Sequence, residues 1–178
     1  MISFVKSAKS LKDFPLTKKE VVFVGRSNAG KSSLLNALYK NNLAYVGKTP
    51  GKTRLINFFD IDGKYTAVDV PGYGFANRNM NEQIEFGQMM DDYFNNRKQI
   101  KLVVCIFDGK IGQTDDDSDM IEYLKDNKLP FIVVFNKIDK LNQSQMYSLK
   151  QKQYKFLISC KTKKGISELK EYIESKLG

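Results

Sequence analysis

The sequence predicts an α/β fold: a three-layer sandwich with a mostly parallel sheet, one antiparallel strand and helices on both faces. Short apolar, β-rich segments alternate with segments of helical periodicity along the 178 residues, which is the pattern of this architecture. The first expected strand and the last three read as continuous apolar runs, as parallel strands covered on both faces do. The expected strands are Val21–Val24, Leu55–Ile61, Tyr65–Val70, Leu102–Phe107, Phe131–Phe135 and Phe156–Ile158.

The antiparallel pairing is expected between the second and third of these strands. Asp62 and Gly63 lie between them, and Asp-Gly is a strong hairpin signal. Thr114 is a plausible N-cap for a helix whose first turn is rich in acids, which favour a helix N-terminus. The expected helices are Lys31–Tyr39, a segment within Asn81–Arg97, Asp115–Asp126 and Ile166–Leu177.

The chain length fits a single domain, expected to span residues 1–178 with a short N-terminal extension at 1–19. No apolar run is long enough to span a bilayer, and no signal peptide or lipidation signal is evident, so we expect no membrane association and a cytoplasmic monomer. Cys105 and Cys160 are expected to be reduced thiols on separate strands. Two cysteines without any histidine make a structural zinc site improbable.

The positive charge is unevenly distributed. The chain carries 29 Lys+Arg against 20 Asp+Glu, a net charge of +9. The stretch from Lys137 to Lys164 holds eight lysines and one acid, and Lys40–Arg54 adds four positive charges without an acid. Clustered lysines favour nucleic-acid binding, but solubility and attraction of a nucleotide explain them equally well on charge alone.

The most informative motif follows the first strand. Gly25 to Ser32 matches G-x-x-x-x-G-K-[ST] between an expected strand and an expected helix, the context that identifies a phosphate-binding P-loop. Glycines let the backbone N–H groups point at phosphate, and the helix N-terminus adds positive potential. Lys31 is expected to reach the β- and γ-phosphates, and the Ser32 hydroxyl to bind Mg²⁺. The candidate nucleotide-binding residues here are Gly25, Arg26, Ser27, Asn28, Ala29, Gly30, Lys31, Ser32 and Ser33.

A second motif, Asp69-Val-Pro-Gly72, ends the third expected strand. An Asp at this position beside a P-loop suits the Mg²⁺ shell, with a bound water between the carboxylate and the metal. The Gly72 backbone N–H can approach a γ-phosphate. Alone, this motif is an ordinary turn, but together with the P-loop it becomes a strong signal.

A third motif, Asn136-Lys137-Ile-Asp139, follows an apolar strand and indicates which nucleotide base is bound. One carboxylate can accept hydrogen bonds from two N–H donors on guanine, and adenine presents no such pair. A helix cap is the alternative explanation for the motif taken alone. Ser159, Cys160 and Lys161 follow the last expected strand, where backbone N–H groups could meet the guanine carbonyl.

In this order the four stretches resemble a P-loop GTPase of the translation-factor-related class. The segments GRSNAGKSSLLNAL, KTPGKTRLINFF, DVPGYGFA and FNKIDK closely resemble the EngB (YsxC/YihA) family of ribosome-biogenesis GTP-binding proteins. The resemblance covers nearly the whole chain, and TPGKT with DVPGYGFA is its family-specific part. It implies GTP or GDP as ligand, Mg²⁺ as cofactor, the large ribosomal subunit as partner and a link to cell division and septation.

The resemblance also implies two switch segments. Thr49–Thr53 would be switch I, with the Thr53 hydroxyl completing the Mg²⁺ shell, and Gly72–Arg78 would be switch II. Lys31, Thr53 and Gly72 are then the catalytic candidates. Tyr73 and Phe75, beside Gly74, are expected to be movable surface anchors; the alternative is that they are core aromatics.

Two residues bear on the rate of hydrolysis. Ras-type GTPases carry a water-orienting Gln at the position of Tyr73, so slow intrinsic hydrolysis is expected. Several related GTPases use an Asn at the position of Asn28 to help bind K⁺; the alternative is an Asn that tolerates a tight loop. Two other functions remain open: a nucleotide-gated RNA-binding module with negligible catalysis, and a signalling-type small GTPase, which Tyr73 and the basic charge disfavour.

Overall fold

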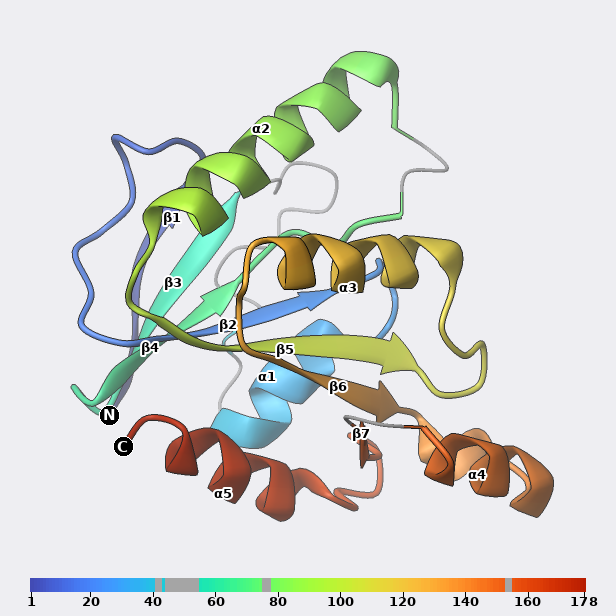
Figure 1. Cartoon of the computed structure of the whole chain (residues 1–178). Coiled ribbons are helices and arrows are strands. Elements are labelled where there is room, and N and C mark those ends of the chain that lie inside the picture. The colour runs from blue at the N-terminus through green and yellow to red at the C-terminus, as the bar shows by residue number, and fades with distance from the viewer. Residues whose placement is uncertain (41–42, 44–54, 75–77, 153–154) are drawn as a thin grey trace.

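A seven-stranded sheet forms the centre of the molecule in a computed structural model, which describes residues 1–40, 43, 55–74, 78–152 and 155–178 (Figure 1). The strand order is β1-β3-β4-β2-β5-β6-β7. The strands are β1 (Ile2–Ala8), β2 (Glu20–Gly25), β3 (Ile56–Ile61), β4 (Tyr65–Asp69), β5 (Ile100–Asp108), β6 (Phe131–Asn136) and β7 (Lys155–Leu157).

The mostly parallel sheet is confirmed. β2 pairs in parallel with β4 and β5, β5 with β6, and β6 with β7. In the described part of the chain, β3 is the one strand that runs against the others, because both of its neighbours pair with it antiparallel. The predicted Asp62-Gly63 hairpin joins β3 to β4, with positive φ values of 55° and 68° at these two residues. All the parallel strands therefore end at one edge, where ligands bind in such sheets.

Helices cover both faces of the sheet. Each face of the sheet has its own apolar core: α1 and α5 pack on one face, and α2, α3 and α4 pack on the other. In Figure 1, α2 and α4 lie at opposite ends of the molecule, with α3 between them. The helices are α1 (Lys31–Tyr39), α2 (Met80–Asn96), α3 (Asp115–Asp126), α4 (Gln143–Lys150) and α5 (Ile166–Ser175), with a 3-10 turn at Ile138–Lys140.

Two elements were not predicted from the sequence. β1 lies within the N-terminal extension and adds an edge strand beside β3. Most of its residues are exposed, so it lacks the apolar alternation of a half-buried strand. α4 buries only Leu149, and apart from Met146 and Tyr147 the rest of its sequence is polar. Its capping box, in which Asn142 and Gln145 exchange hydrogen bonds, was the available signal.

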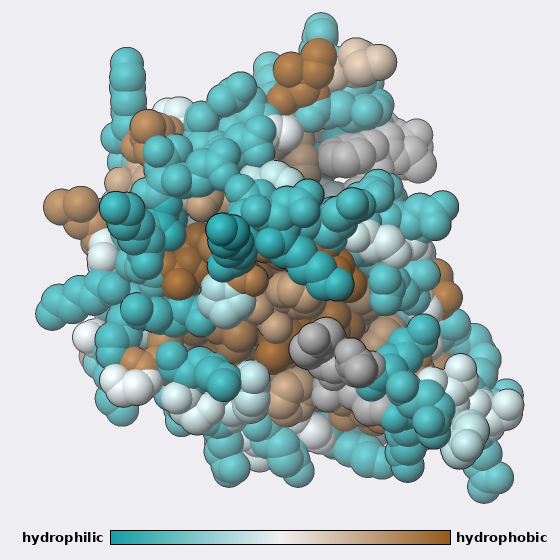
Figure 2. Space-filling view, in the orientation of Figure 1, coloured by the Kyte–Doolittle hydropathy of each residue, from teal (hydrophilic) through white to brown (hydrophobic). Residues whose placement is uncertain are grey.

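The surface agrees with this layered arrangement. Figure 2 shows apolar side chains gathered in the middle of the visible face, with hydrophilic side chains around them. Among the described residues, no helix is both long and apolar enough to cross a membrane.

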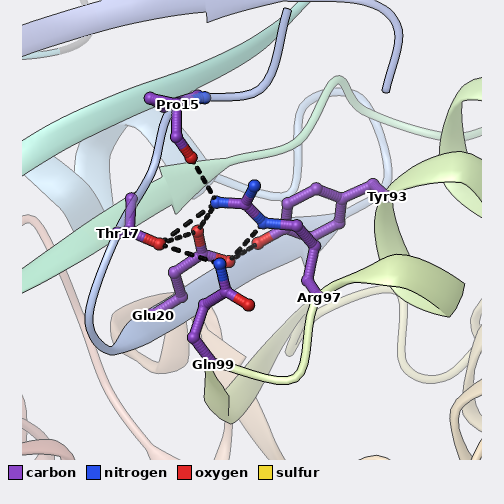
Figure 3. Close-up of polar contacts among 6 residues, drawn as sticks. All are labelled: Pro15, Thr17, Glu20, Tyr93, Arg97 and Gln99. Carbon is purple, nitrogen blue, oxygen red and sulfur yellow. Dashed lines mark hydrogen bonds and ion pairs between the residues drawn. The ribbon is translucent and has the colours of Figure 1, made fainter. Parts of the chain in front are cut away.

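A buried ion pair lies where β2 begins, at the edge of the sheet opposite the predicted site. Glu20 is 0% exposed, and its carboxylate pairs with the guanidinium of Arg97, the C-cap residue directly after α2 (Figure 3). The Tyr93 hydroxyl donates to Glu20 Oε2 at 2.6 Å, and Thr17 Oγ1 donates to Glu20 Oε1 at 2.6 Å. Arg97 Nη2 also donates to the Pro15 carbonyl at 2.9 Å.

This network joins three distant parts of the chain. The segment before β2, the first residue of β2 and the end of α2 meet at one carboxylate (Figure 3). Every charge is paired, and the Arg97 guanidinium also lies 5.5 Å from the Phe58 ring centroid. Burial raises the pKa of Tyr93 well above its ordinary value, and the Glu20 charge raises it further, so this hydroxyl stays a donor. Removing one partner would leave an uncompensated charge in the core.

We expect Arg97→Met to lower the free energy of unfolding by about 3–5 kcal/mol, because Glu20 then lies buried without a counter-charge. For a domain of this size the melting temperature should fall by roughly 2–4 °C per kcal/mol. Urea unfolding followed by circular dichroism measures the loss. The matched double variant Glu20→Gln/Arg97→Met should recover part of it; a double variant as unstable as the single one would contradict this account.

Candidate nucleotide-binding site

The predicted P-loop forms a tight turn between β2 and α1. β2 ends at Gly25 and α1 begins at Lys31, as predicted. The turn is held by a hydrogen bond from Ala29 N to Arg26 O at 3.1 Å. Gly30 has φ +97°, and a Cβ there would lie 2.2 Å from Asn136 Nδ2. Only glycine fits this position, for reasons of both backbone conformation and space.

This turn encloses a hollow of about 470 Å³ at the carboxyl edge of the sheet. A smaller hollow of about 200 Å³ adjoins it and includes Ala29 and Asp108 in its lining. The larger one has the size of an ordinary small-molecule site. Its lining residues are Arg26, Ser27, Asn28, Gly30, Lys31, Ser32, Ser33, Gly72 and Lys137.

The end of β4 faces the P-loop, as the second motif predicts. The Lys31 ammonium forms an ion pair with Asp69, the last residue of β4. Gly72 lies so close to the P-loop that a Cβ there would be 3.0 Å from Ser27 N. Among the described residues, no three His, Cys, Asp or Glu side chains come together as metal ligands. The donor set of a hydroxyl at Ser32 and a carboxylate at Asp69 fits Mg²⁺, which takes few protein ligands and keeps several waters.

Tyr73 is not a surface anchor, and the sequence-based expectation for it was wrong. Its side chain is 3% exposed and packs in the core on the α2 and α3 face of the sheet. Its hydroxyl donates to Asp117 Oδ1 at 2.6 Å, in the first turn of α3. Burial and the Asp117 carboxylate raise the pKa of Tyr73 far above its ordinary value. A buried aromatic ring with a satisfied hydroxyl stays in the core rather than at the surface.

The backbone of Tyr73 pairs with the P-loop. Ser27 N donates to Tyr73 O at 2.9 Å, and Tyr73 N donates to Gly25 O at 3.2 Å. A displacement of Gly72 and Tyr73 must therefore break contacts with the phosphate-binding turn. Phe75 and the segment Thr49–Thr53, with the candidate Thr53, lie outside the described residues.

Asn136 joins three of the predicted loops. Its Nδ2 donates to Ala29 O at 3.2 Å, and its Oδ1 accepts from Cys160 N at 3.2 Å. The side chain is 2% exposed, so these bonds form away from water. Asn136 therefore holds the P-loop and the loop after β7 in register with the end of β6.

Asp139 is fixed by the loop after β7. Ser159 Oγ donates to Asp139 Oδ1 at 2.7 Å, and Thr162 N donates to Ser159 Oγ at 3.1 Å. The Asp139 carboxylate is exposed, so it can still accept hydrogen bonds from a ligand. Lys161 is also exposed, next to Cys160. The residues predicted to read a base are thus brought together.

Asp108, at the end of β5, was missed by the sequence analysis. Lys137 Nζ donates to Asp108 Oδ2 at 2.7 Å and to Asn28 O at 2.7 Å. Burial alone would raise the pKa of Asp108, but the hydrogen bonds from Lys137, Ile111 N and Lys110 N lower it. An Asp-Gly pair directly after an apolar strand was the signal that could have identified this residue.

Both cysteines are free thiols, as expected, but the placement of Cys160 on a strand was wrong: Cys105 lies in β5, whereas Cys160 lies in the loop after β7. Burial raises the pKa of Cys160 to about 11, so its thiol is protonated at neutral pH. Cys105 is buried in β5, and burial raises its thiol pKa as well. Thiols in this state are poor nucleophiles, so the contribution of Cys160 to the site is its backbone N–H.

The fold and the arrangement of these loops define a P-loop GTPase. The family described as "50S ribosome-binding GTPase" matches residues 20–137 of the chain. The chain is therefore an enzyme of the GTP-hydrolysing class.

Comparison with individual relatives identifies the family within this class of GTPases. "Probable GTP-binding protein EngB" of Thermotoga petrophila is 42% identical over 187 residues, covering 99% of this chain and 96% of the relative. The protein of the same description from Metamycoplasma arthritidis is 42% identical and covers 98% of this chain and 100% of the relative. A crystal structure of a probable GTP-binding protein engB matches with a TM-score of 0.73 and 27% identity, covering 89% of this chain and 98% of that one. The chain belongs to the EngB family of GTP-binding proteins.

We expect Gly30→Ala to weaken binding of a fluorescent GDP analogue by about tenfold or more, because the new Cβ collides with Asn136. Gly63→Ala is the matched control: Gly63 has φ +68°, but a Cβ there has none of the described atoms within 4 Å. It should cost about 1–2 kcal/mol of stability and leave nucleotide affinity unchanged. Equal affinities for Gly30→Ala and the parent protein would refute the argument.

Proposed function

We propose that this GTPase is a nucleotide-gated switch in assembly of the large ribosomal subunit, acting as a cytoplasmic monomer. The observation that carries the proposal is a lysine-rich surface beside the predicted base-binding loops. Six lysines of the 137–164 stretch are exposed there: Lys140, Lys150, Lys152, Lys161, Lys163 and Lys164. A surface of this kind suits the phosphate backbone of rRNA. The family description, which names 50S ribosome binding, supports the same partner.

We assign phosphate binding to Gly25–Ser33. Lys31 would leave its ion pair with Asp69 and bind the β- and γ-phosphates instead. Ser32 and Thr53 would hold Mg²⁺ directly, and Asp69 through a water. When bound, Mg²⁺ neutralises charge on the phosphate oxygens. The Gly72 N–H would meet the γ-phosphate, so the Gly72–Tyr73 backbone would report whether that phosphate is present.

Guanine recognition is assigned to the loops that Asn136 joins. Asp139 would accept from guanine, and Ser159 would hold that carboxylate in place through its 2.7 Å hydrogen bond. The backbone N–H groups of Ser159–Lys161 would face the guanine carbonyl, and the Lys137 stem would lie along the base. An adenine base would leave Asp139 unsatisfied, which is the physical basis of the selectivity.

Intrinsic hydrolysis should be slow. The position that carries a water-orienting Gln in Ras-type GTPases holds Tyr73, whose hydroxyl is committed to Asp117 at 2.6 Å. A group supplied by the assembling subunit would then complete the catalytic machinery.

We also propose that K⁺ binds near the phosphates through Asn28. Asn28 lines the larger hollow, which places it beside the expected phosphates. Its φ of 71° is a left-handed conformation that Asn tolerates, so the test must distinguish a K⁺ ligand from a residue that only suits the turn. A monovalent cation there would supply positive charge where the transition state gains negative charge. Hydrolysis should be faster in KCl than in NaCl at equal ionic strength, and Asn28→Ala should remove the difference. Equal rates of the parent protein in both salts would rule K⁺ out.

The ribosomal proposal is tested by pelleting the protein with purified large subunits, with GDP or a non-hydrolysable GTP analogue, across a salt series. Binding should be stronger with the analogue and should fall steeply with salt. Lys150→Gln/Lys152→Gln/Lys163→Gln should reduce the log–log salt slope by roughly one unit per lost phosphate contact.

The control removes the same charge elsewhere. Lys12→Gln/Lys18→Gln/Lys98→Gln alters three exposed lysines away from the base-binding loops and should leave the slope nearly unchanged. If the protein pellets at no salt concentration while it still binds guanine nucleotide, the large ribosomal subunit is not its partner.

A further inference from the structure

A hollow of about 430 Å³ lies between α2 and α3, separate from the nucleotide site. Its apolar lining comes from buried side chains of both helices and of the segment before α2: Tyr73, Phe86, Met90 and Met120. One end is closed by a hydrogen bond from the Tyr123 hydroxyl to Asp91 Oδ1 at 2.8 Å, which links the two helices. We call this hollow the α2–α3 groove.

Nothing in the described part of the chain explains a glycine in the wall of the groove. Gly87 lies in the interior of α2, where glycine costs about 0.5–1 kcal/mol relative to alanine. Its φ is not positive, and within the described residues no atom lies within 4 Å of a Cβ built there. Neither backbone conformation nor crowding requires glycine at this position. Its effect is to leave space at the groove wall.

Apolar side chains continue the groove along α2. Met80 and Ile84 are 70% and 63% exposed. They recur with Gly87 and Asp91 at spacings of three or four residues, so the four residues share one stripe of the helix. Large exposed apolar side chains next to an apolar hollow are typical of a protein interaction site.

The rim of the groove is acidic. Asp91, Asp116 and Asp119 line it and are exposed. α2 and α3 together hold ten of the chain's twenty acids and one lysine, a net charge of −9. Because the whole chain carries +9, all other residues together carry +18. The helices beside the groove are therefore the acidic part of a basic protein.

We propose that the α2–α3 groove binds a basic peptide segment of a protein partner, which inserts an apolar side chain between Phe86, Met90 and Met120. The acidic rim pairs with the Lys and Arg residues of the segment, and the apolar floor buries its anchor. The acidic rim repels phosphate, which disfavours nucleic acid and anionic lipid surfaces as occupants. This binding mode does not depend on the ribosomal role proposed above.

The groove is connected to the nucleotide site through Tyr73. The side chain of Tyr73 lines the groove, while its backbone pairs with Gly25 and Ser27 of the P-loop. A bound segment and a bound nucleotide would therefore act on the same residue. By linkage, each would change the affinity of the other by the same factor.

The test uses fluorescein-labelled decapeptides with basic flanks and one central anchor, either Leu, Met, Phe or Trp. Fluorescence anisotropy with the full chain should show binding of at least one of them about tenfold tighter than a peptide with Ser at the anchor position. A peptide with Glu in the flanks should not bind. If no anchored peptide binds more tightly than the Ser peptide, the proposal is wrong.

Two matched pairs of variants locate the binding. Gly87→Leu fills the groove and should weaken binding about tenfold, whereas Gln88→Leu adds the same side chain at the next exposed position and should not. Asp116→Asn/Asp119→Asn removes two rim charges, and Glu122→Gln/Asp126→Asn removes two exposed charges of α3 outside the groove. Of these two double variants, only Asp116→Asn/Asp119→Asn should weaken binding of the peptide. Thermal melting and nucleotide affinity verify that every variant is folded.

Two outcomes would assign the groove to another occupant and overturn the proposal. Concentration-dependent self-association in analytical ultracentrifugation, abolished by Gly87→Leu, would identify a second copy of this chain. Binding of an RNA oligonucleotide that Gly87→Leu abolishes would identify nucleic acid. Loss of ribosome pelleting alone would leave the peptide result unaffected, so the two proposals fail separately.

Discussion

The two hydrogen bonds of Asn136 are the constraint on which the site depends. One amide side chain fixes the carbonyl of Ala29 in the P-loop and the N–H of Cys160 in the loop after β7. These loops are far apart in sequence and meet only because parallel strands end at the same edge of the sheet. The contact also dictates Gly30, since any Cβ there would occupy the position of the Asn136 amide. One buried amide thus links a phosphate-binding turn to a base-binding loop.

Stability and ligand binding are divided between the two edges of the sheet. At the amino edge, the Glu20–Arg97 pair is buried and fully hydrogen-bonded (Figure 3). At the carboxyl edge, Asp139 and Asn28 remain exposed, and the Lys31–Asp69 pair lies beside an open hollow. Glu20 and Arg97 have their hydrogen-bond partners within the chain. The polar groups at the carboxyl edge can exchange a partner for a ligand.

Much of the fold and of the candidate site could be predicted from the sequence, because local signals and tertiary structure agree. Lys31–Tyr39 and Asp115–Asp126 were predicted to the residue, since a glycine turn and a capping Thr114 mark their starts. β1 was missed because it is an exposed edge strand whose pairing with β3 is a long-range contact. Tyr73 was misplaced because Asp117, its hydroxyl's acceptor, lies 44 residues away and leaves no local pattern. Asp108 was missed because its partner Lys137 is distant in the chain, and the Asp-Gly pair after the apolar run, a local signal, was not used.

The separation of charge along the molecule has a kinetic consequence. α2 lies at one end of the molecule and α4 at the other (Figure 1), and the acids of α2 are thus remote from the lysines around α4. Such a molecule has an electric dipole as well as a net charge. In the field of a large polyanion it would turn before contact, with its lysine-bearing end leading. The α2–α3 groove would then face away from the polyanion, so that orientation during approach, rather than any selective contact, keeps that face open to solvent.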